Sequence, residues 1–222
     1  MIKKILHMIT LAILISSGIL GFIKKQSYTD LRTQDNYLEQ LKVAVMSEDL
    51  AVNVCQKMAD SLPDCPIILR VTAISDVEHL FWSGRQKVRI EHIYRGTELD
   101  EGEEIYIGGE MWNLRLWDKS KQSVGCGFVN YLKQGTEYLI FSTGRIEGMD
   151  GINPVYILYD ESILTPVFSY DTIKNVPIAI QNSSDKSVTY GQAKSNEFFG
   201  ETDLAIESWE NLKADMLDKF PR

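Results

Sequence analysis

Five short segments rich in β-branched and aromatic residues place the strongest constraint on how this chain folds. Glycine-rich or acidic turns separate them, and short runs of this composition between turn residues are typical of β-strands. The sequence therefore predicts a mainly β domain in the middle of the chain. The five predicted strands comprise residues 67–74, 87–94, 104–107, 138–141 and 155–159.

Amphipathic helices are predicted on both sides of these strands. Ser47 precedes an acidic first turn, and apolar residues recur at helical spacing until Pro63, which disfavours helical geometry in the residue before it. From Thr202, apolar residues again recur at helical spacing as far as Phe220. We expect helices over residues 47–62 and 202–220, the second packing on the strands. The segment from 167 to 190 shows no clear period and is predicted to be strand and loop.

The first 25 residues contain an almost uninterrupted apolar run, residues 5–22, with a lysine pair on each side. At the rise of an α-helix this run spans roughly 27 Å, close to the thickness of the hydrocarbon core of a bilayer. Residues 1–25 are therefore predicted to be a signal anchor. A cleaved signal peptide is the alternative, with small residues at 16–18 or 19–21 before the cut. The polar residues 26–46 are predicted to form a stalk.

The chain carries a net charge of −8, and its basic residues are scattered. Because binding to a phosphate backbone requires clustered Lys and Arg, no nucleic-acid partner is expected. His79 and His92 have no neighbouring ligand at the spacing of a zinc site, and the acidic turn at 100–104 lacks the pattern of a calcium loop. We therefore predict no metal and no other cofactor. No motif of a catalytic nucleophile or phosphate-binding loop occurs, so an enzyme is not expected.

A glycine–cysteine motif, Gly125-Cys126-Gly127, precedes the strand Gly135–Phe141, and Ile93–Gly96 forms an apolar-aromatic-basic-glycine turn upstream. This combination resembles the OB barrels of netrin modules and of the tissue inhibitors of metalloproteinases. The resemblance covers residues 55–166, about half of the chain. It implies a five-stranded Greek-key barrel of the OB type over residues 47–166, placed outside the cytosol, with residues 167–222 as an extension that packs on it.

The same resemblance implies a disulfide between Cys55 and Cys126, which would tie the segment before the first strand to the barrel. Two alternatives remain open. Cys65 lies at the start of the first predicted strand and is an alternative partner for Cys126, since pairing cannot be deduced from sequence. In the second alternative no disulfide forms, and all three cysteines are buried as small apolar residues. With three cysteines in the chain, at least one stays single.

In the resembled inhibitors, the amino-terminal cysteine chelates the zinc of the protease through its free amine. That first cysteine is missing here, and Cys55 lies inside the chain. Inhibition by this mechanism is therefore not expected. An inhibitor of an extracellular protease that needs no terminal amine is the alternative to the function proposed next.

Exposed aromatic residues are the predicted contact surface for a partner, because aromatic residues dominate the energetics of interfaces. For Trp112, Leu114 and Leu116, the alternative is a half-buried strand, since these residues are spaced by two. The predicted contact residues are Trp112, Leu114, Leu116 and Trp117, together with Phe81 and Trp82.

These observations predict a non-catalytic, extracytoplasmic binding module that recognises a protein or a component of the cell envelope. The amino-terminal helix would hold it on the membrane, or the protein would be secreted if the leader is cleaved. An enzyme with a site assembled from scattered carboxylates is a third hypothesis.

Overall fold

The computed structural model describes residues 7, 10, 11, 13–21, 36–80, 82–116, 122–148, 151–180 and 186–222. The chain divides into two compact units, Met1–Tyr37 and Leu38–Arg222. In the first unit, the described residues between 10 and 21 are helical. Within the described part of the chain, no helix is both long enough and apolar enough to cross a membrane.

Only part of the predicted amino-terminal organisation lies among the described residues. Much of the predicted signal anchor and residues 26–35 of the predicted stalk lie outside them. The end of the predicted stalk is corrected, because it folds into α2 (Tyr37–Gln40) and β1 (Lys42–Ala44), and β1 belongs to the sheet. The folded unit therefore begins near Leu38 rather than at residue 47.

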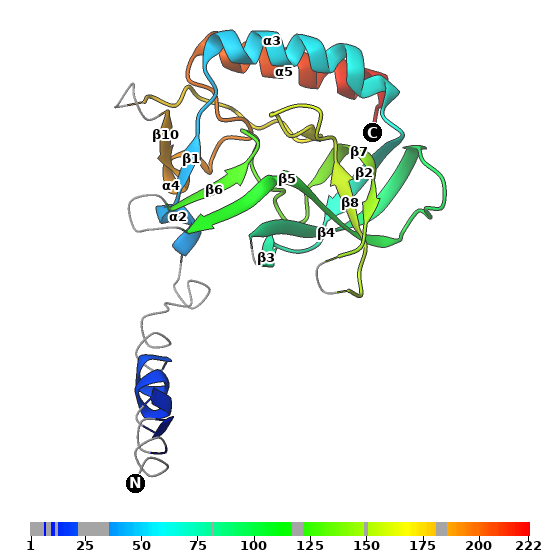
Figure 1. The fold of residues 1–222 in the computed structure, drawn as a ribbon. Helices are drawn as coiled ribbons and strands as arrows, with labels where there is room; N and C mark the ends of the chain where they lie inside the picture. Colours follow the sequence, from blue (N-terminus) through cyan, green and yellow to red (C-terminus); the bar gives the residue numbers. More distant parts are fainter. Residues whose placement is uncertain are drawn as a thin grey trace. The chain divides into compact units, whose positions relative to one another are not determined.

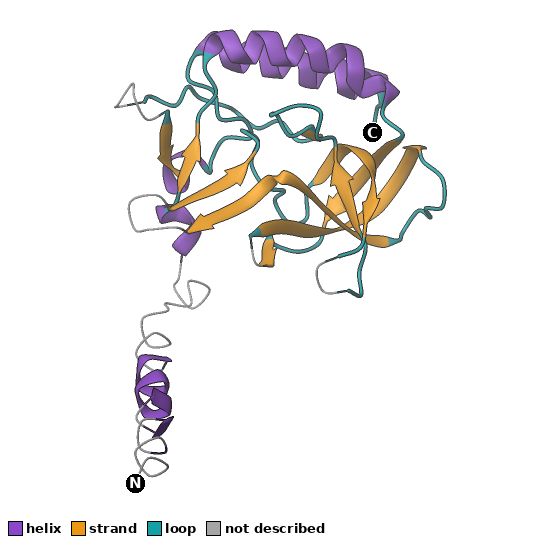
Figure 2. Cartoon of the chain, viewed as in Figure 1, coloured by secondary structure: helices purple, strands orange, loops and turns teal. Residues whose placement is uncertain are grey.

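The second unit is mainly β, and its ten described strands form a single sheet (Figures 1 and 2). Five of them pair in a closed cycle: β2 with β4, β4 with β5, β5 with β8, β8 with β7, and β7 with β2. The pair β5–β8 is parallel and the other four are antiparallel. These strands are β2 (Ile67–Ala73), β4 (Ser83–Arg95), β5 (Glu104–Leu116), β7 (Glu137–Ile146) and β8 (Val155–Leu158).

All five strands predicted from the sequence are confirmed, and they are the five strands of this cycle. Three are clearly longer than predicted, and one of them is β7, which continues to Ile146. β4 begins at Ser83, and β5 continues to Leu116. The pairing of β2 with β4 changes register twice, so that Glu91 and Tyr94 have no partner on β2. Such bulges increase the twist and bend of a strand, as a small closed cycle of strands requires.

Short strands extend the sheet beyond the cycle. The second half of β5 pairs with β6 (Gln122–Cys126), β6 pairs with β1, and β1 pairs with β10 (Ser187–Thr189), which leads into α4 (Tyr190–Ala193). On the other side, β3 (Glu78–Leu80) forms a hairpin with β4. β9 (Val167–Ser169) pairs with β7. β9 lies just after the predicted domain boundary at 166/167, so the predicted extension begins with a strand of the same sheet.

Two helices cover one side of the sheet, α3 (Glu48–Ser61) and α5 (Asp203–Lys219), and they lie side by side (Figure 1). Both predicted helices are confirmed, and α3 passes into the 3-10 turn η2 (Leu62–Asp64) at Pro63. Thr202 caps α5 by accepting a hydrogen bond from the Ala205 N–H at 3.2 Å. It also donates to Glu48 at 2.9 Å, which joins the first turns of the two helices.

The core beneath α5 is aromatic. Trp209 is fully buried, and its ring stacks between Phe168 at 4.8 Å and Phe198 at 5.2 Å. Phe168 lies on β9, and it also contacts Phe141 of β7 edge to face. Aromatic side chains bury more apolar area than other residues, so this stack is a large contribution to the free energy of folding. It attaches α5 and the segment before it firmly to the cycle of strands.

Candidate functional site

The predicted aromatic contact surface is corrected by the structure. Trp112 and Leu114 lie on β5 with exposed fractions of 1% and 6%, so neither is available to a partner. The ring of Trp112 instead packs edge to face on Tyr131 at 5.1 Å. The alternative prediction, a half-buried strand, is confirmed for this segment. Every second side chain of such a strand faces the core, as Trp112 and Leu114 do.

The other predicted contact residues have different outcomes. Leu116 is partly buried at the end of β5. Trp82 remains 54% exposed at the tip of the β3–β4 hairpin. Phe81 and Trp117 lie outside the described residues. Among the predicted contact residues that the structure describes, Trp82 is therefore the one with an exposed side chain.

All three cysteines lie among the described residues, and each is a buried free thiol. The disulfide predicted between Cys55 and Cys126, or alternatively from Cys65, is therefore not formed in this structure. The three thiols sit on different elements: Cys55 in α3, Cys65 just before β2, and Cys126 at the end of β6. Burial raises the pKa of Cys55 and of Cys126 to about 12 and that of Cys65 to about 11. These thiols match the expectation for small buried apolar residues with low reactivity.

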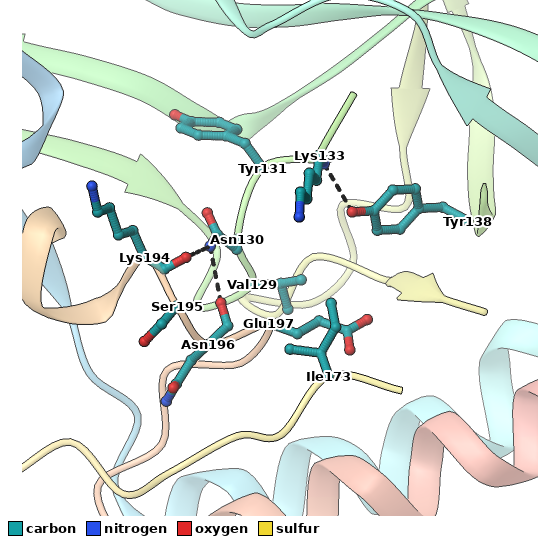
Figure 3. A pocket seen from close by; sticks show the side chains of 10 residues that line it. All are labelled: Val129, Asn130, Tyr131, Lys133, Tyr138, Ile173, Lys194, Ser195, Asn196 and Glu197. Atoms are coloured by element: carbon teal, nitrogen blue, oxygen red, sulfur yellow. Dashed lines mark hydrogen bonds between the residues drawn. The ribbon is translucent and has the colours of Figure 1, made fainter. Parts of the chain in front are cut away.

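The candidate site is a cavity of about 300 Å³ where the segment after β6, the start of β7 and two late loops meet (Figure 3). This volume is at the lower end of the range for ligand pockets. Val129, Tyr138 and Glu197 are buried in its walls. Lys133 and Ser195 are exposed at its rim.

Three asparagine side chains hold the loops of the cavity together. Asn130 donates to the carbonyls of Lys194 at 2.8 Å and Asn196 at 2.9 Å (Figure 3). Asn175 accepts from the N–H of Glu197 at 2.8 Å. Asn196 donates to the Val176 carbonyl at 2.6 Å. Because buried backbone groups need partners, these amides replace the pairing that a regular strand would supply.

Backbone pairing completes this frame. The Asn130 N–H donates to the Glu197 carbonyl at 2.8 Å, and the Phe199 N–H donates to the Phe128 carbonyl at 2.9 Å. Gly127 begins the turn, with a positive φ of 62°. A Cβ atom at this position would lie 2.1 Å from the Thr165 hydroxyl oxygen. The glycine of the sequence motif is therefore required by both backbone conformation and space.

A buried ion pair lies behind the cavity. Lys213 of α5 contacts Glu197, and the exposed fractions of the two side chains are 9% and 3%. The other oxygen of Glu197 accepts from the Ser169 N–H at 2.6 Å. Burial raises the pKa of Glu197, and the ammonium of Lys213 opposes this effect. Both carboxylate oxygens are thus engaged, and the pair joins α5, β9 and the cavity wall.

Tyr131 connects the cavity to the β3–β4 hairpin. Its hydroxyl donates to the Gly125 carbonyl at 2.9 Å, and it lies 3.3 Å from Nε2 of His79. Because the single tyrosine hydrogen is used, His79 must donate from Nε2, which leaves Nδ1 as a buried atom without a partner. Burial lowers the pKa of His79, in agreement with a neutral ring.

The outer face of β4 and β5 carries charges in matched pairs. Arg85 lies 2.7 Å from Glu78, Lys87 contacts Glu104, and Arg89 lies 2.8 Å from Glu91. The guanidinium of Arg85 also lies 4.1 Å above the ring of Tyr106. A hydrogen bond from Thr72, with further help from Arg89, lowers the pKa of Glu91. This face of the sheet has little unused charge to offer a ligand.

None of the cavity residues was predicted from the sequence. Asn130, Asn175 and Asn196 act on distant backbone groups, and such contacts leave no local pattern. One signal does exist. Lys213 lies on the same face of the predicted helix as Trp209 and Met216, and a lysine within an apolar stripe indicates a buried charge that needs a partner.

No model of a known protein family matches this chain, and no curated protein was found as a relative. The candidate site is therefore interpreted from its own geometry.

Proposed function

We propose that the closed cycle of strands is an OB-type barrel. The order β2–β4–β5–β8–β7 gives five strands in a Greek-key arrangement closed by one parallel pair. This is the arrangement expected from the resemblance to netrin modules and metalloproteinase inhibitors. Two features support the proposal: the bulges in the β2–β4 pairing bend the strands, and the glycine–cysteine motif lies at the end of β6, where the chain leaves the sheet.

On this scaffold, the chain functions as a non-catalytic, extracytoplasmic binding module. The face of strands two and three is a common ligand surface of OB folds, and here it corresponds to β4 and β5. Its charges are already paired, whereas the cavity beside β7 is framed by hydrogen bonds and open at its rim. The observation that carries the proposal is this preformed cavity, and the ligand is one that presents a group small enough to enter it.

A protein or envelope partner, as the sequence predicts, has a second place to bind at the hairpin tips. Trp82 is 54% exposed between β3 and β4, and Ile152 is 82% exposed between β7 and β8. Exposed tryptophan is enriched among residues that dominate binding energy. Replacing Trp82 with Ser should abolish such binding without changing stability, and comparison of the unfolding midpoints of the two proteins checks the second part.

A fragment screen by NMR on the full-length chain in a neutral detergent tests the proposed function. We expect hits to shift the amide signals of residues 129–133 and 194–197. The variant Ser195→Trp should lose these hits, because the indole occupies the cavity. The control Lys57→Trp, on the exposed side of α3, should keep them. Hits that gather at other residues, or that survive in Ser195→Trp, would refute the cavity as the binding site.

A further inference from the structure

The polar groups of the cavity fall into two sets, those whose hydrogen bonds are already made and those with capacity left. The side chains of Asn130 and Asn196 bond to backbone groups, and both oxygens of Glu197 accept hydrogen bonds. Within the described part of the chain, the ammonium of Lys133 and the hydroxyl of Ser195 make no hydrogen bond or ion pair. The remaining capacity at the rim is therefore that of an ammonium, which only donates hydrogen bonds, and of a hydroxyl, which can donate or accept.

Tyr138 supplies a third donor from the cavity wall. Its hydroxyl oxygen accepts from the Lys133 N–H at 2.8 Å, and the hydroxyl points into the cavity (Figure 3). No contact of its own hydrogen to an acceptor is found among the described residues, although the side chain is only 4% exposed. A buried hydroxyl hydrogen without an acceptor is costly, so a ligand atom that accepts it is favoured. Burial raises the pKa of Tyr138 to about 12, which keeps this hydrogen in place at neutral pH.

The charges around the cavity leave one cation uncompensated. Lys194 pairs with Glu39 at 2.6 Å, and Lys213 neutralises Glu197. Lys133 has no such partner in the described structure. An ammonium together with two hydroxyl donors forms charge-assisted hydrogen bonds most strongly with anionic oxygen.

We propose that the cavity binds a small oxyanion, a carboxylate or phosphate group, with Lys133 as its counter-ion and Tyr138 and Ser195 as hydrogen-bond donors. This inference rests on the proposed binding function and names the chemistry of the ligand. A volume of about 300 Å³ admits a small acid or phosphate ester. The net charge of −8 disfavours an anionic polymer or membrane surface, so the anion is a small soluble one.

Titration of the full-length chain, in a neutral detergent and at constant ionic strength, tests this assignment. The probes are succinate, inorganic phosphate and the neutral diamide succinamide, which matches succinate in size. We expect at least one of the two anions to shift the amide signals of residues 129–133 and 194–197, and succinamide to leave them unchanged.

Single variants assign the roles. Lys133→Gln should weaken anion binding by about tenfold or more, because it removes a charge-assisted contact. Tyr138→Phe should weaken it by about fivefold, because one neutral donor is lost. Lys57→Gln, which removes an equal charge from the exposed side of α3, should leave the Kd unchanged within about twofold, since exposed charges act weakly at a distance. Thermal unfolding of each variant verifies that it is folded.

The possible outcomes separate the two proposals. If succinamide or uncharged fragments shift the cavity signals while both anions fail, the oxyanion assignment is wrong and the binding function stands. If Lys133→Gln and Lys57→Gln weaken binding equally, the anion responds to overall charge and the assignment is also wrong. If no probe or fragment affects the cavity residues, the proposed function fails with it.

Discussion

Charged side chains on the outer face of β4 and β5 differ from those around the cavity in what they contact. On β4 and β5, pairs such as Arg89–Glu91 are accessible to solvent, and each charge is compensated by its partner. Around the cavity, Glu197 and Lys213 are almost fully buried, and Lys133 has no partner in the described structure. The exposed charges on the strands are thus compensated by neighbouring charges, whereas the loops around the cavity carry Glu197, which pairs with Lys213 of α5, and Lys133, a cation unpaired among the described residues.

This difference shows where stability and binding capacity are concentrated. Exposed ion pairs contribute little to stability, because solvent screens them. A buried pair behaves differently, since removal of one partner leaves an uncompensated charge in the interior. Loops are usually the mobile and tolerant parts of a fold. Here the loops around the cavity are fixed by asparagine side chains and a buried ion pair, as a preformed site requires.

The largest expected effect comes from breaking the buried pair. Lys213→Met should lower the free energy of unfolding by about 3–5 kcal/mol, because Glu197 would stay buried without its counter-ion. Lys87→Met, which breaks the exposed pair with Glu104, should have a far smaller effect. Urea unfolding of both variants measures the contrast. Equal losses from the two substitutions would show that the buried and exposed pairs do not differ as described.

A smaller effect is expected at the turn where the sheet passes into the cavity. Gly127→Ala should cost about 2–4 kcal/mol, because it combines a strained backbone conformation with a clash against Thr165. Gly135 also has a positive φ, but nothing lies within 4 Å of an added Cβ. Gly135→Ala should therefore cost only the backbone strain, about 1 kcal/mol. Thermal unfolding in which Gly135→Ala proved the more damaging change would contradict this account of the turn.

The smallest effect concerns His79, which joins the β3–β4 hairpin to the cavity through Tyr131. Because burial lowers its pKa in the folded state, the unfolded chain takes up the proton first as the pH falls below about 6.5. The stability associated with the neutral ring is present above that pH and is lost below it.

The variant His79→Gln should therefore show a weaker fall in unfolding midpoint between about pH 7 and pH 5 than the unchanged chain. His92→Gln, on the exposed end of β4, is the control and should keep the full fall. Parallel pH profiles for the chain with and without His79 would show that burial of this ring does not contribute to the fall in stability.

The strands of the cycle were predictable, because each of them has a recognisable local sequence pattern. Residues 138–141, for example, are a continuous run of apolar residues, and residues 67–73 are apolar or β-branched apart from Arg70. Outside the cycle, β1, β3 and β6 were not predicted, and β9 and β10 lie in a segment that was predicted only as strand and loop, without bounds. β1 and β10 have three residues each, and they are strands only because Lys42 and Thr189, far apart in the sequence, lie opposite each other. A three-residue strand carries too little local pattern to be recognised.

The candidate site escaped prediction for a different reason. The prediction was based on tryptophan and other large apolar residues, and one of these, Trp112, is a core residue that packs edge to face on Tyr131. The residues that frame the cavity are ordinary in sequence, since Asn130 and Asn196 acquire their role from backbone groups brought near by folding. Side-chain bonds to distant backbone depend on the tertiary structure, which no local rule describes.

The joining of the earliest and latest elements of the folded unit has a kinetic consequence. Lys194 and Glu39 are 155 residues apart, and Thr202 and Glu48 are 154 residues apart, yet each pair is in contact. Contacts at such separation form only after a long loop has closed, and proteins dominated by them refold in milliseconds to seconds rather than microseconds. This protein should therefore be a slow folder, and during refolding its unpaired strand edges would be open to aggregation for an extended time.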